Sequence, residues 1–224
     1  MKRHGLDLCL LVGAPLAVVA GLTLGRSVWV VFAVYHVGIC LVLPWARERL
    51  GNGTSWVDHR RHLGLSHFFW RGILLGLGTG ALVLAAFFTL GRGVLDREII
   101  DAALAAWGVP IAHQKMVALF MLVVNGPAEE LFWRGYMHHR LADWPARPGA
   151  LAATSLGYAS YHAVTVHLLI GQVAWAAAVF LGVAAAGFGW AWLREKTGSV
   201  WPALLSHLAA TWAYVFIWLT LGLG

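Results

Sequence analysis

Apolar stretches long enough to cross a lipid bilayer recur along almost the whole chain. A helix needs about 20 apolar residues to span the hydrocarbon core. Hydrophobic residues make up 60% of the 224-residue sequence and charged residues 12%, whereas about 25% of the residues in soluble domains are charged. We therefore predict an all-α polytopic bundle of seven transmembrane helices, folded as a single integral membrane domain over residues 1–224. The predicted spans are residues 6–24, 27–45, 72–90, 116–133, 149–170, 172–193 and 200–223.

The N-terminal span has the outline of a signal peptide, because Lys2 and Arg3 precede its apolar part. A second apolar span follows directly after Arg26, with no soluble domain between the two. We therefore expect the first span to be retained as a helix of the bundle.

Two connections are longer than the others, at residues 46–71 and 91–115. The first contains the polar run Asp58–His62, whose histidines and aspartate could suggest a metal site, although we expect a solvated loop facing lipid headgroups. The second contains an amphipathic segment at residues 96–107, which we expect to lie in the membrane interface. An eighth, broken or re-entrant span in this second connection is the alternative, and it would change the parity of the crossings.

The positive net charge of +6 does not indicate nucleic-acid binding, because the basic residues form short clusters between apolar spans. Such clusters orient membrane proteins, since Lys and Arg are enriched in cytoplasmic loops. With a cytoplasmic N-terminus, twelve of the sixteen Lys and Arg residues face the cytoplasm. We expect a multi-pass protein of a cell membrane, interpreted as a bacterial plasma membrane, whose partners are the lipid bilayer and a protein or peptide substrate. The four basic residues on the other side are Arg26, Arg92, Arg97 and Lys115.

Two adjacent carboxylates, Glu129 and Glu130, stand at the end of the fourth apolar span, where their insertion costs a few kcal/mol each. Pro127 suits the first turn of a helix, so the span either breaks and restarts at Gly126-Pro127 or kinks there. Glu130 and Arg134 are four residues apart, which favours an ion pair on one helix face. Glu129 is rotated by about 100° from that face and is left for another role.

Histidines on two further spans are the other candidate site residues. His162 follows Tyr158 by one helical turn, and His207 precedes Thr211 by one turn. A lone histidine in an apolar helix is usually a packed core residue, but two on different helices together with Glu129 indicate a site. Two more histidines, His36 and His167, have no such polar residue one turn away and are interpreted as packing or interface residues.

These residue types can hydrolyse a peptide bond. A buried glutamate such as Glu129 can deprotonate water and later protonate the leaving amine. A histidine and a hydroxyl can stabilise the oxyanion. Glu129, His162 and His207 could instead bind zinc, as other sets of two histidines and one glutamate do. Spacing alone leaves both versions open.

Three motifs on three spans resemble the CPBP family, the CAAX prenyl protease and bacteriocin-processing group of intramembrane proteases. Residues 129–134 match its EExxxR motif in full. Residues 158–162 match FxxxH with Tyr158 in place of phenylalanine, and residues 207–211 match HxxxN with Thr211 in place of asparagine. The resemblance covers residues 117–212, which we interpret as the catalytic core.

The resemblance implies a helix bundle with a cavity open to the cytoplasm, in which Glu129 activates water. It implies that Glu130 and Arg134 support this glutamate and that His162 positions the glutamate or the water. It assigns His207 and the position of Thr211 to the oxyanion. It also favours a metal-independent glutamate mechanism, so we expect no cofactor. If zinc were used, its ligands would be Glu129, His162 and His207.

Two departures from the family pattern bear on activity. Tyr158 adds a hydroxyl that needs a partner inside the bundle. Thr211 reaches less far than an asparagine amide, and loss of an essential oxyanion donor would lower activity by about 10²–10³. Ser206 or a backbone group could compensate.

The leading hypothesis is an intramembrane endopeptidase that cuts membrane-associated, C-terminally sorted or lipidated proteins or peptides with glutamate-activated water. The alternative, motivated by Thr211, is a non-catalytic immunity or scaffold protein that binds a peptide or a membrane partner. A third is a transporter with a proton-relaying carboxylate. Such a transporter is expected to contain repeated halves, and the sequence has none.

Overall fold

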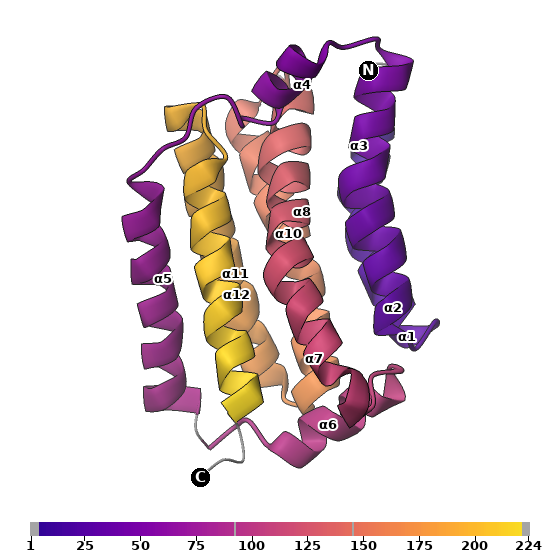
Figure 1. Cartoon of the computed structure of the whole chain (residues 1–224), viewed down its shortest axis with the longest axis vertical. Helices are drawn as coiled ribbons and strands as arrows, with labels where there is room; N and C mark the ends of the chain where they lie inside the picture. The colour runs from indigo at the N-terminus through magenta and orange to yellow at the C-terminus, as the bar shows by residue number, and fades with distance from the viewer. Residues whose placement is uncertain (1–4, 92, 145, 221–224) are drawn as a thin grey trace.

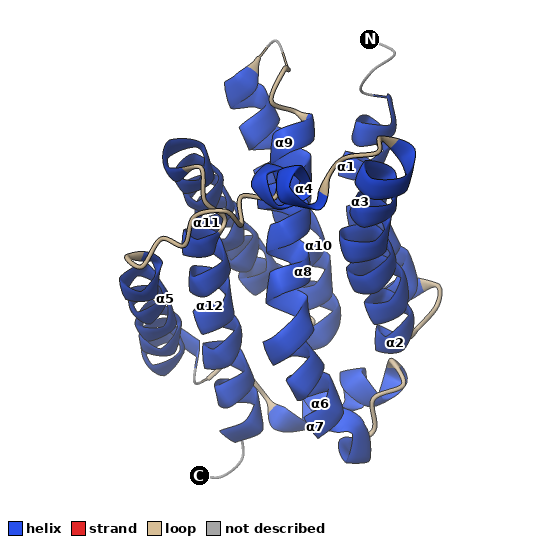
Figure 2. Cartoon of the chain, turned by 45° about the horizontal axis from the view of Figure 1, so that its top comes forward, coloured by secondary structure: helices blue, strands red, loops and turns tan. Residues whose placement is uncertain are grey.

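The computed structural model describes residues 5–91, 93–144 and 146–220, and nearly all of this part of the chain is helical (Figure 2). No strand occurs in these ranges, so the predicted all-α fold is confirmed. The predicted end of the last span, at residues 221–223, lies outside the described residues. The same is true of Lys2, Arg3 and Arg92, which entered the prediction of orientation.

Seven long helices form the bundle in the described part of the chain (Figure 1). They are α1 (Gly5–Thr23), the run from α2 to η3 (Val28–Gly51), the run from α5 to η4 (Gly72–Gly91), the run from α7 to α9 (Ile111–Arg140), α10 (Arg147–Ile170), α11 (Val173–Thr197) and α12 (Trp201–Thr220). The beginning of α1 and the end of α12 lie at opposite ends of the bundle, as an odd number of crossings requires.

Three of these helices are composite, with η marking stretches of wide π-turns. Their parts are α2 (Val28–Val31), η2 (Phe32–Val42), α3 (Leu43–Ala46) and η3 (Arg47–Gly51); α5 (Gly72–Ala86) and η4 (Phe87–Gly91); and α7 (Ile111–Phe120), η5 (Met121–Asn125), α8 (Gly126–Glu130), η6 (Leu131–Met137) and α9 (His138–Arg140).

By length and composition, 6 of the helices in the described residues can cross a membrane. The seventh predicted span is α10, which is 24 residues long but less apolar than the others. Its lower hydropathy has a direct cause, since it carries polar side chains such as Tyr158, Tyr161 and His162. The multi-pass membrane architecture is therefore confirmed, and its most polar helix is one that carries candidate site residues.

The connections contain short helices. Residues 56–62 form α4 (Trp56–His62), within the segment that the sequence predicted as a loop. The amphipathic segment forms α6 (Arg97–Ala106), capped by Asp96, whose carboxylate accepts hydrogen bonds from the backbone of Glu98 and Ile99. With 10 residues, α6 is too short to span a bilayer, and it lies across one end of the bundle (Figure 1). No eighth span forms in the described part of this connection.

The fourth span neither breaks nor ends at the Gly126-Pro127 step. Gly126 has helical torsion angles, φ −57 and ψ −51, and the helix continues for 30 residues from Ile111 to Arg140. Wide turns before and after α8 accommodate Pro127, because they change the hydrogen-bond register around a residue that lacks an N–H. The sequence predicted that the two glutamates lie at the end of this span. In the structure they lie inside the helix instead.

Glycines allow α5 to approach α12 closely. A Cβ atom on Gly72 would lie 2.9 Å from the Cα of Pro202, and one on Gly76 would lie 2.9 Å from the carbonyl oxygen of Leu205. Small residues at such contacts are typical of membrane helices, where close packing replaces the hydrophobic effect as the source of association. This contact supports α12, the helix that carries His207.

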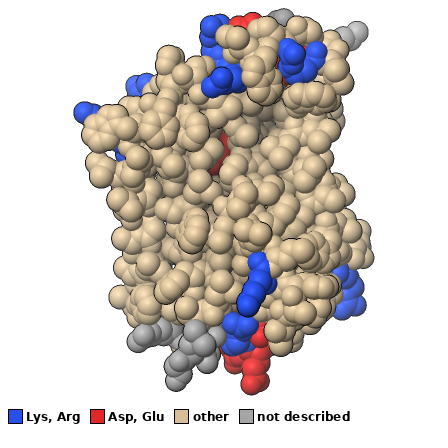
Figure 3. All heavy atoms as spheres, viewed as in Figure 1, with Lys and Arg blue, Asp and Glu red and all other residues tan. Residues whose placement is uncertain are grey.

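Charged side chains on the face shown in Figure 3 gather at the two ends of the molecule and leave a broad uncharged middle. This arrangement fits an apolar belt in contact with lipid tails. In the upper half of that face, an acidic side chain is visible inside a small opening. An acidic side chain therefore lies between the two charged ends and is visible from this face.

Candidate active site

Glu130 is held by two basic side chains in the centre of the bundle. Its Oε1 accepts a hydrogen bond of 2.9 Å from Nη1 of Arg134 and one of 3.0 Å from Nδ1 of His207. The first of these contacts is the ion pair predicted from the four-residue spacing, and the second was not predicted. Because Glu130 is fully buried, both contacts offset the cost of keeping its charge away from water.

Glu129 points away from that pair, as the rotation of the helix predicted. Its Oε1 accepts a 2.7 Å hydrogen bond from the hydroxyl of Tyr161 and lies 3.5 Å from Nε2 of His36. Its Oε2 lies 3.7 Å from Nε2 of His207 and has no hydrogen-bond partner among the described residues. One carboxylate oxygen is therefore fixed, and the other faces a histidine.

His207 lies between the two glutamates. Its Nδ1 donates to Glu130, since an ionised carboxylate only accepts hydrogen bonds, so its Nε2 faces Glu129. The ring stacks on Trp190 at 5.3 Å between centroids with 16° between planes. The indole N–H of Trp190 in turn donates to Ser206 at 2.9 Å. Carboxylate and indole together fix the orientation of the imidazole ring.

The hydroxyl of Tyr158, which the sequence comparison left in need of a partner, lies 3.4 Å from Nε2 of His207. The guanidinium carbon of Arg134 lies 4.3 Å from the centroid of the Tyr158 ring, a cation–π contact. Tyrosine at this position thus connects the Glu130–Arg134 pair with the face of His207 that is turned to Glu129.

Thr211 lies one turn after His207 and is fully buried. Its hydroxyl has no well-formed hydrogen bond among the described residues, although the Tyr214 hydroxyl is close enough to interact with it. The hydroxyl of Ser206, which could compensate for the missing asparagine, is already engaged with Trp190 and, at 2.7 Å, with Thr79.

His162 stands beside Glu129 without contacting it. Its Nδ1 donates a 2.9 Å hydrogen bond to the backbone carbonyl of Tyr158, and its ring packs against Tyr161 at 4.4 Å between centroids. No hydrogen bond or ion pair joins His162 to Glu129 in the described part of the chain. The bond from Nδ1 leaves Nε2 as the ring nitrogen that can serve an incoming group.

His36, which the sequence interpreted as a packing or interface residue, is buried and packs against Phe32 and Phe120, and it also lies beside Glu129. Its Nε2 donates to Oδ1 of Asn125 at 2.6 Å and lies 3.5 Å from Oε1 of Glu129. The available signal was Asn125, a polar residue four positions before Glu129 that needed a partner inside the bundle. His167, by contrast, lies outside the site and lines an open apolar hollow with Val173 and Phe180.

The residues of the zinc alternative do not converge on a point. Among the described His, Cys, Asp and Glu side chains, no group of 3 is arranged to hold a metal ion, and this includes Glu129, His162 and His207. The Asp58–His62 run provides no such group either. His62 in that run pairs with Glu48 at 3.2 Å and stacks on His139 at 3.8 Å between centroids.

Comparison with known proteins adds one match. Residues 111–213 match the family model described as Type II CAAX prenyl endopeptidase Rce1-like. No curated protein and no solved structure matches the chain. The matched segment runs from α7 to α12 and contains both glutamates, Arg134, His162 and His207. Residues 111–213 are therefore similar to the Rce1-like CAAX endopeptidases, a family of membrane proteases, and the chain is a multi-pass membrane protein that contains this segment.

Proposed function

We propose that this protein is an intramembrane endopeptidase in which Glu129 activates the attacking water. The observation that carries the proposal is the unequal state of the two carboxylate oxygens of Glu129. Oε1 is fixed by Tyr161, whereas Oε2 is buried without a hydrogen bond and lies 3.7 Å from Nε2 of His207. A water molecule that bridges these two atoms would meet a base and a polar ring nitrogen at the same point.

In the proposed reaction, Glu129 takes a proton from this water as the oxygen attacks the scissile carbonyl. His207, with a proton on Nε2, and the hydroxyl of Thr211 stabilise the oxyanion of the tetrahedral intermediate. Glu129 then gives its proton to the leaving amine as the C–N bond breaks. Glu130 and Arg134 hold His207 in place through the bond to Nδ1.

We infer that His162 acts from the other side, through its Nε2, on the substrate or on the water. Its Nδ1 is already used by the carbonyl of Tyr158. This role is positional, because the structure has no direct bond between His162 and Glu129.

The proposed substrates are membrane-associated proteins or peptides cut near a C-terminus that carries a lipid or a sorting signal. The description of the matched family, a CAAX prenyl endopeptidase, supports the lipidated class. The site lies inside the membrane-spanning helix bundle, and this position supports a substrate that is itself held at the membrane. We further propose that the N-terminus faces the cytoplasm, as the bias of basic residues indicates.

Comparison of the membrane proteomes of cells that express the wild-type protein or Glu129→Ala tests the function. We expect C-terminal peptides of membrane-associated proteins to differ between the two. Identical C-terminal peptides in both would contradict the endopeptidase. Retention of the biological effect of the protein in Glu129→Ala cells would instead favour the non-catalytic immunity or scaffold function.

Activity is expected to survive removal of metal ions, because the proposed mechanism uses only side chains. Purified protein should cleave its substrate at an unchanged rate in the presence of a strong chelator, and metal analysis should find less than one equivalent of zinc. Loss of activity in chelator that returns on addition of zinc would overturn the metal-independent mechanism.

The variant Thr211→Val tests the oxyanion donor. Valine keeps the shape of threonine without the hydroxyl, so kcat is expected to fall by about 10²-fold, the lower end for loss of one oxyanion donor. Stability should not fall, since the buried hydroxyl of Thr211 lacks a well-formed bond. Initial rates and thermal unfolding in detergent measure the two effects. Unchanged kcat would remove Thr211 from the mechanism.

A further inference from the structure

We propose that Trp133, Tyr35 and Tyr161 form a hydrogen-bonded chain that positions the carboxylate of Glu129. The inference rests on the proposed function, because it assigns these three residues to the preparation of the proposed base. Trp133 and Tyr161 occupy unspecified positions inside the first two motifs and Tyr35 lies outside them, and the sequence assigned a role to none of the three.

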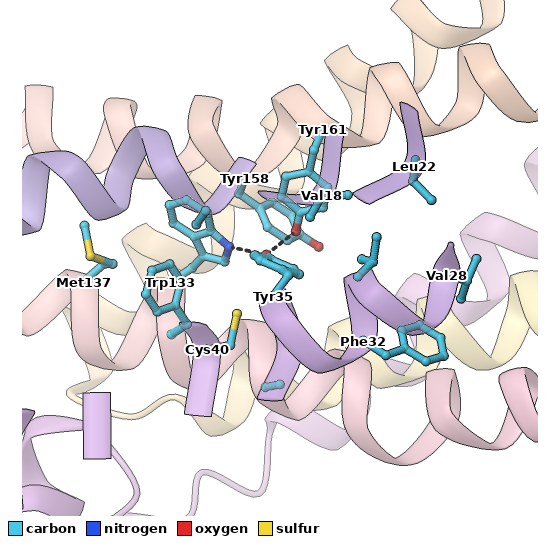
Figure 4. Close-up of a cluster of buried hydrophobic side chains, with 14 of the residues drawn as sticks. Val18, Leu22, Val28, Phe32, Tyr35, Cys40, Trp133, Met137, Tyr158 and Tyr161 are labelled. Atoms are coloured by element: carbon cyan, nitrogen blue, oxygen red, sulfur yellow. Dashed lines mark hydrogen bonds between the residues drawn. The ribbon is translucent and has the colours of Figure 1, made fainter. Parts of the chain in front are cut away.

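This hydrogen-bonded chain of side chains is continuous and buried. The indole N–H of Trp133 donates to the Tyr35 hydroxyl at 3.0 Å, and that hydroxyl donates to the Tyr161 hydroxyl at 2.8 Å (Figure 4). Tyr161 then donates to Oε1 of Glu129 at 2.7 Å. The exposed fractions along the chain are 1% for Trp133, 0% for Tyr35, 4% for Tyr161 and 2% for Glu129. Water therefore does not compete for these hydrogen bonds.

Chemistry fixes the direction of the chain at both ends. The indole of Trp133 can only donate, and the ionised carboxylate of Glu129 can only accept. Each hydroxyl between them has a single proton, and both protons must point toward the glutamate. Successive bonds of this kind polarise one another in a low-dielectric interior, so Tyr35 strengthens the bond that Tyr161 makes.

The chain also ties the carboxylate to three helices. Trp133 lies one turn after Glu129 on the same long helix, whereas Tyr35 comes from η2 and Tyr161 from α10. The chain therefore leaves the fourth span, crosses two neighbouring helices and returns to the fourth span at the carboxylate. Because Oε1 is committed to Tyr161, Oε2 is directed toward His207.

A purely structural role predicts a different pattern of mutational effects. Buried phenols need hydrogen-bond partners wherever they occur, and removing any of them would then affect folding alone. Residues that act in series on one carboxylate instead affect turnover, and their effects do not multiply. The pattern of effects on turnover distinguishes the two cases.

The test uses Tyr161→Phe, Tyr35→Phe and the double variant, reconstituted as full chains in phosphatidylcholine vesicles. The probe is an internally quenched peptide that ends in an S-farnesylated cysteine and three further residues. We expect kcat to fall about 10-fold in Tyr161→Phe, the scale of losing one hydrogen bond to a charged group, with KM unchanged. Tyr35→Phe should lower kcat about 2-fold to 3-fold, because it only weakens the Tyr161 bond. The double variant should match Tyr161→Phe.

Tyr136→Phe is the matched control. Tyr136 is as buried as the chain residues and accepts a 2.7 Å hydrogen bond from Arg47, but it does not join the chain. Its substitution should leave kcat unchanged. A wild-type kcat in Tyr161→Phe, or effects of the two single substitutions that multiply, would overturn the proposal.

A second readout needs no turnover. The infrared difference between wild type and Glu129→Gln identifies the carboxylate stretching band of Glu129. This band should shift in Tyr161→Phe, shift less in Tyr35→Phe and stay in place in Tyr136→Phe. If wild-type protein cleaves the probe and the Tyr161→Phe band does not move, the chain is overturned and the function stands. If the wild-type protein cleaves no peptide but the Glu129 band shifts in Tyr161→Phe, the proposed function fails. The hydrogen-bonded chain then remains supported as the group that orients this carboxylate.

Discussion

Replacing Glu129 with glutamine is expected to lower kcat for peptide hydrolysis by at least about 10³-fold, within the range of 10²–10⁴ for loss of a general acid–base group. Glutamine has nearly the same shape and can still accept the hydrogen bond from Tyr161, but it cannot take a proton from water. KM is expected to change little, because the substituted group acts on water rather than on the bound chain. Initial rates at several substrate concentrations separate kcat from KM.

Glu130→Gln is the control for this prediction, since it removes the adjacent carboxylate with the same change of atoms. Glu130 contacts Arg134 and His207, so its loss should reduce kcat less than the loss of Glu129. Both proteins should elute as folded protein in gel filtration, but thermal unfolding should show Glu130→Gln to be the less stable, because it leaves the buried Arg134 charge without its carboxylate. A Glu129→Gln protein that retains more activity than Glu130→Gln would reverse the roles proposed for the two glutamates.

The parts of this arrangement that local geometry controls could be predicted from the sequence. Apolar length located all seven long helices, because lipid leaves a chain few other ways to satisfy its backbone. The spacing of Glu130 and Arg134 predicted their ion pair, and a rotation of about 100° per residue predicted that Glu129 faces other helices. Both results follow from the periodicity of one helix.

The contacts between helices could not be predicted in this way. His36 was assigned to packing because nothing in its own span marks it, whereas its partner Asn125 is 89 positions away in the chain. The bond of His207 to Glu130 likewise depends on how α12 is placed against α8. The fourth helix was also predicted too short. Backbone hydrogen bonding continues past the apolar stretch, from residue 133 to Arg140.

Breaking the buried pair of Glu130 and Arg134 is expected to have the largest effect on stability. The exposed fractions of their side chains are 0% and 2%. Arg134→Met would leave the Glu130 carboxylate buried with only His207 beside it, and removal of one partner of such a pair costs about 3–5 kcal/mol. Chemical unfolding in detergent micelles measures the free energy of unfolding. Arg61→Met is the control, because its pair with Asp58 is exposed and screened by water, so its effect should be small.

The double variant Glu130→Gln/Arg134→Met separates stability from catalysis. Replacement of both charges by neutral groups of similar size removes the uncompensated carboxylate, so most of the lost stability should return. Activity should stay low, because Nδ1 of His207 then faces a neutral amide and the ring is held less firmly against Glu129. If the double variant recovers activity together with stability, the ion pair only supports the fold and does not position His207. If Arg134→Met is as stable as Arg61→Met, the pair does not stabilise the bundle at all.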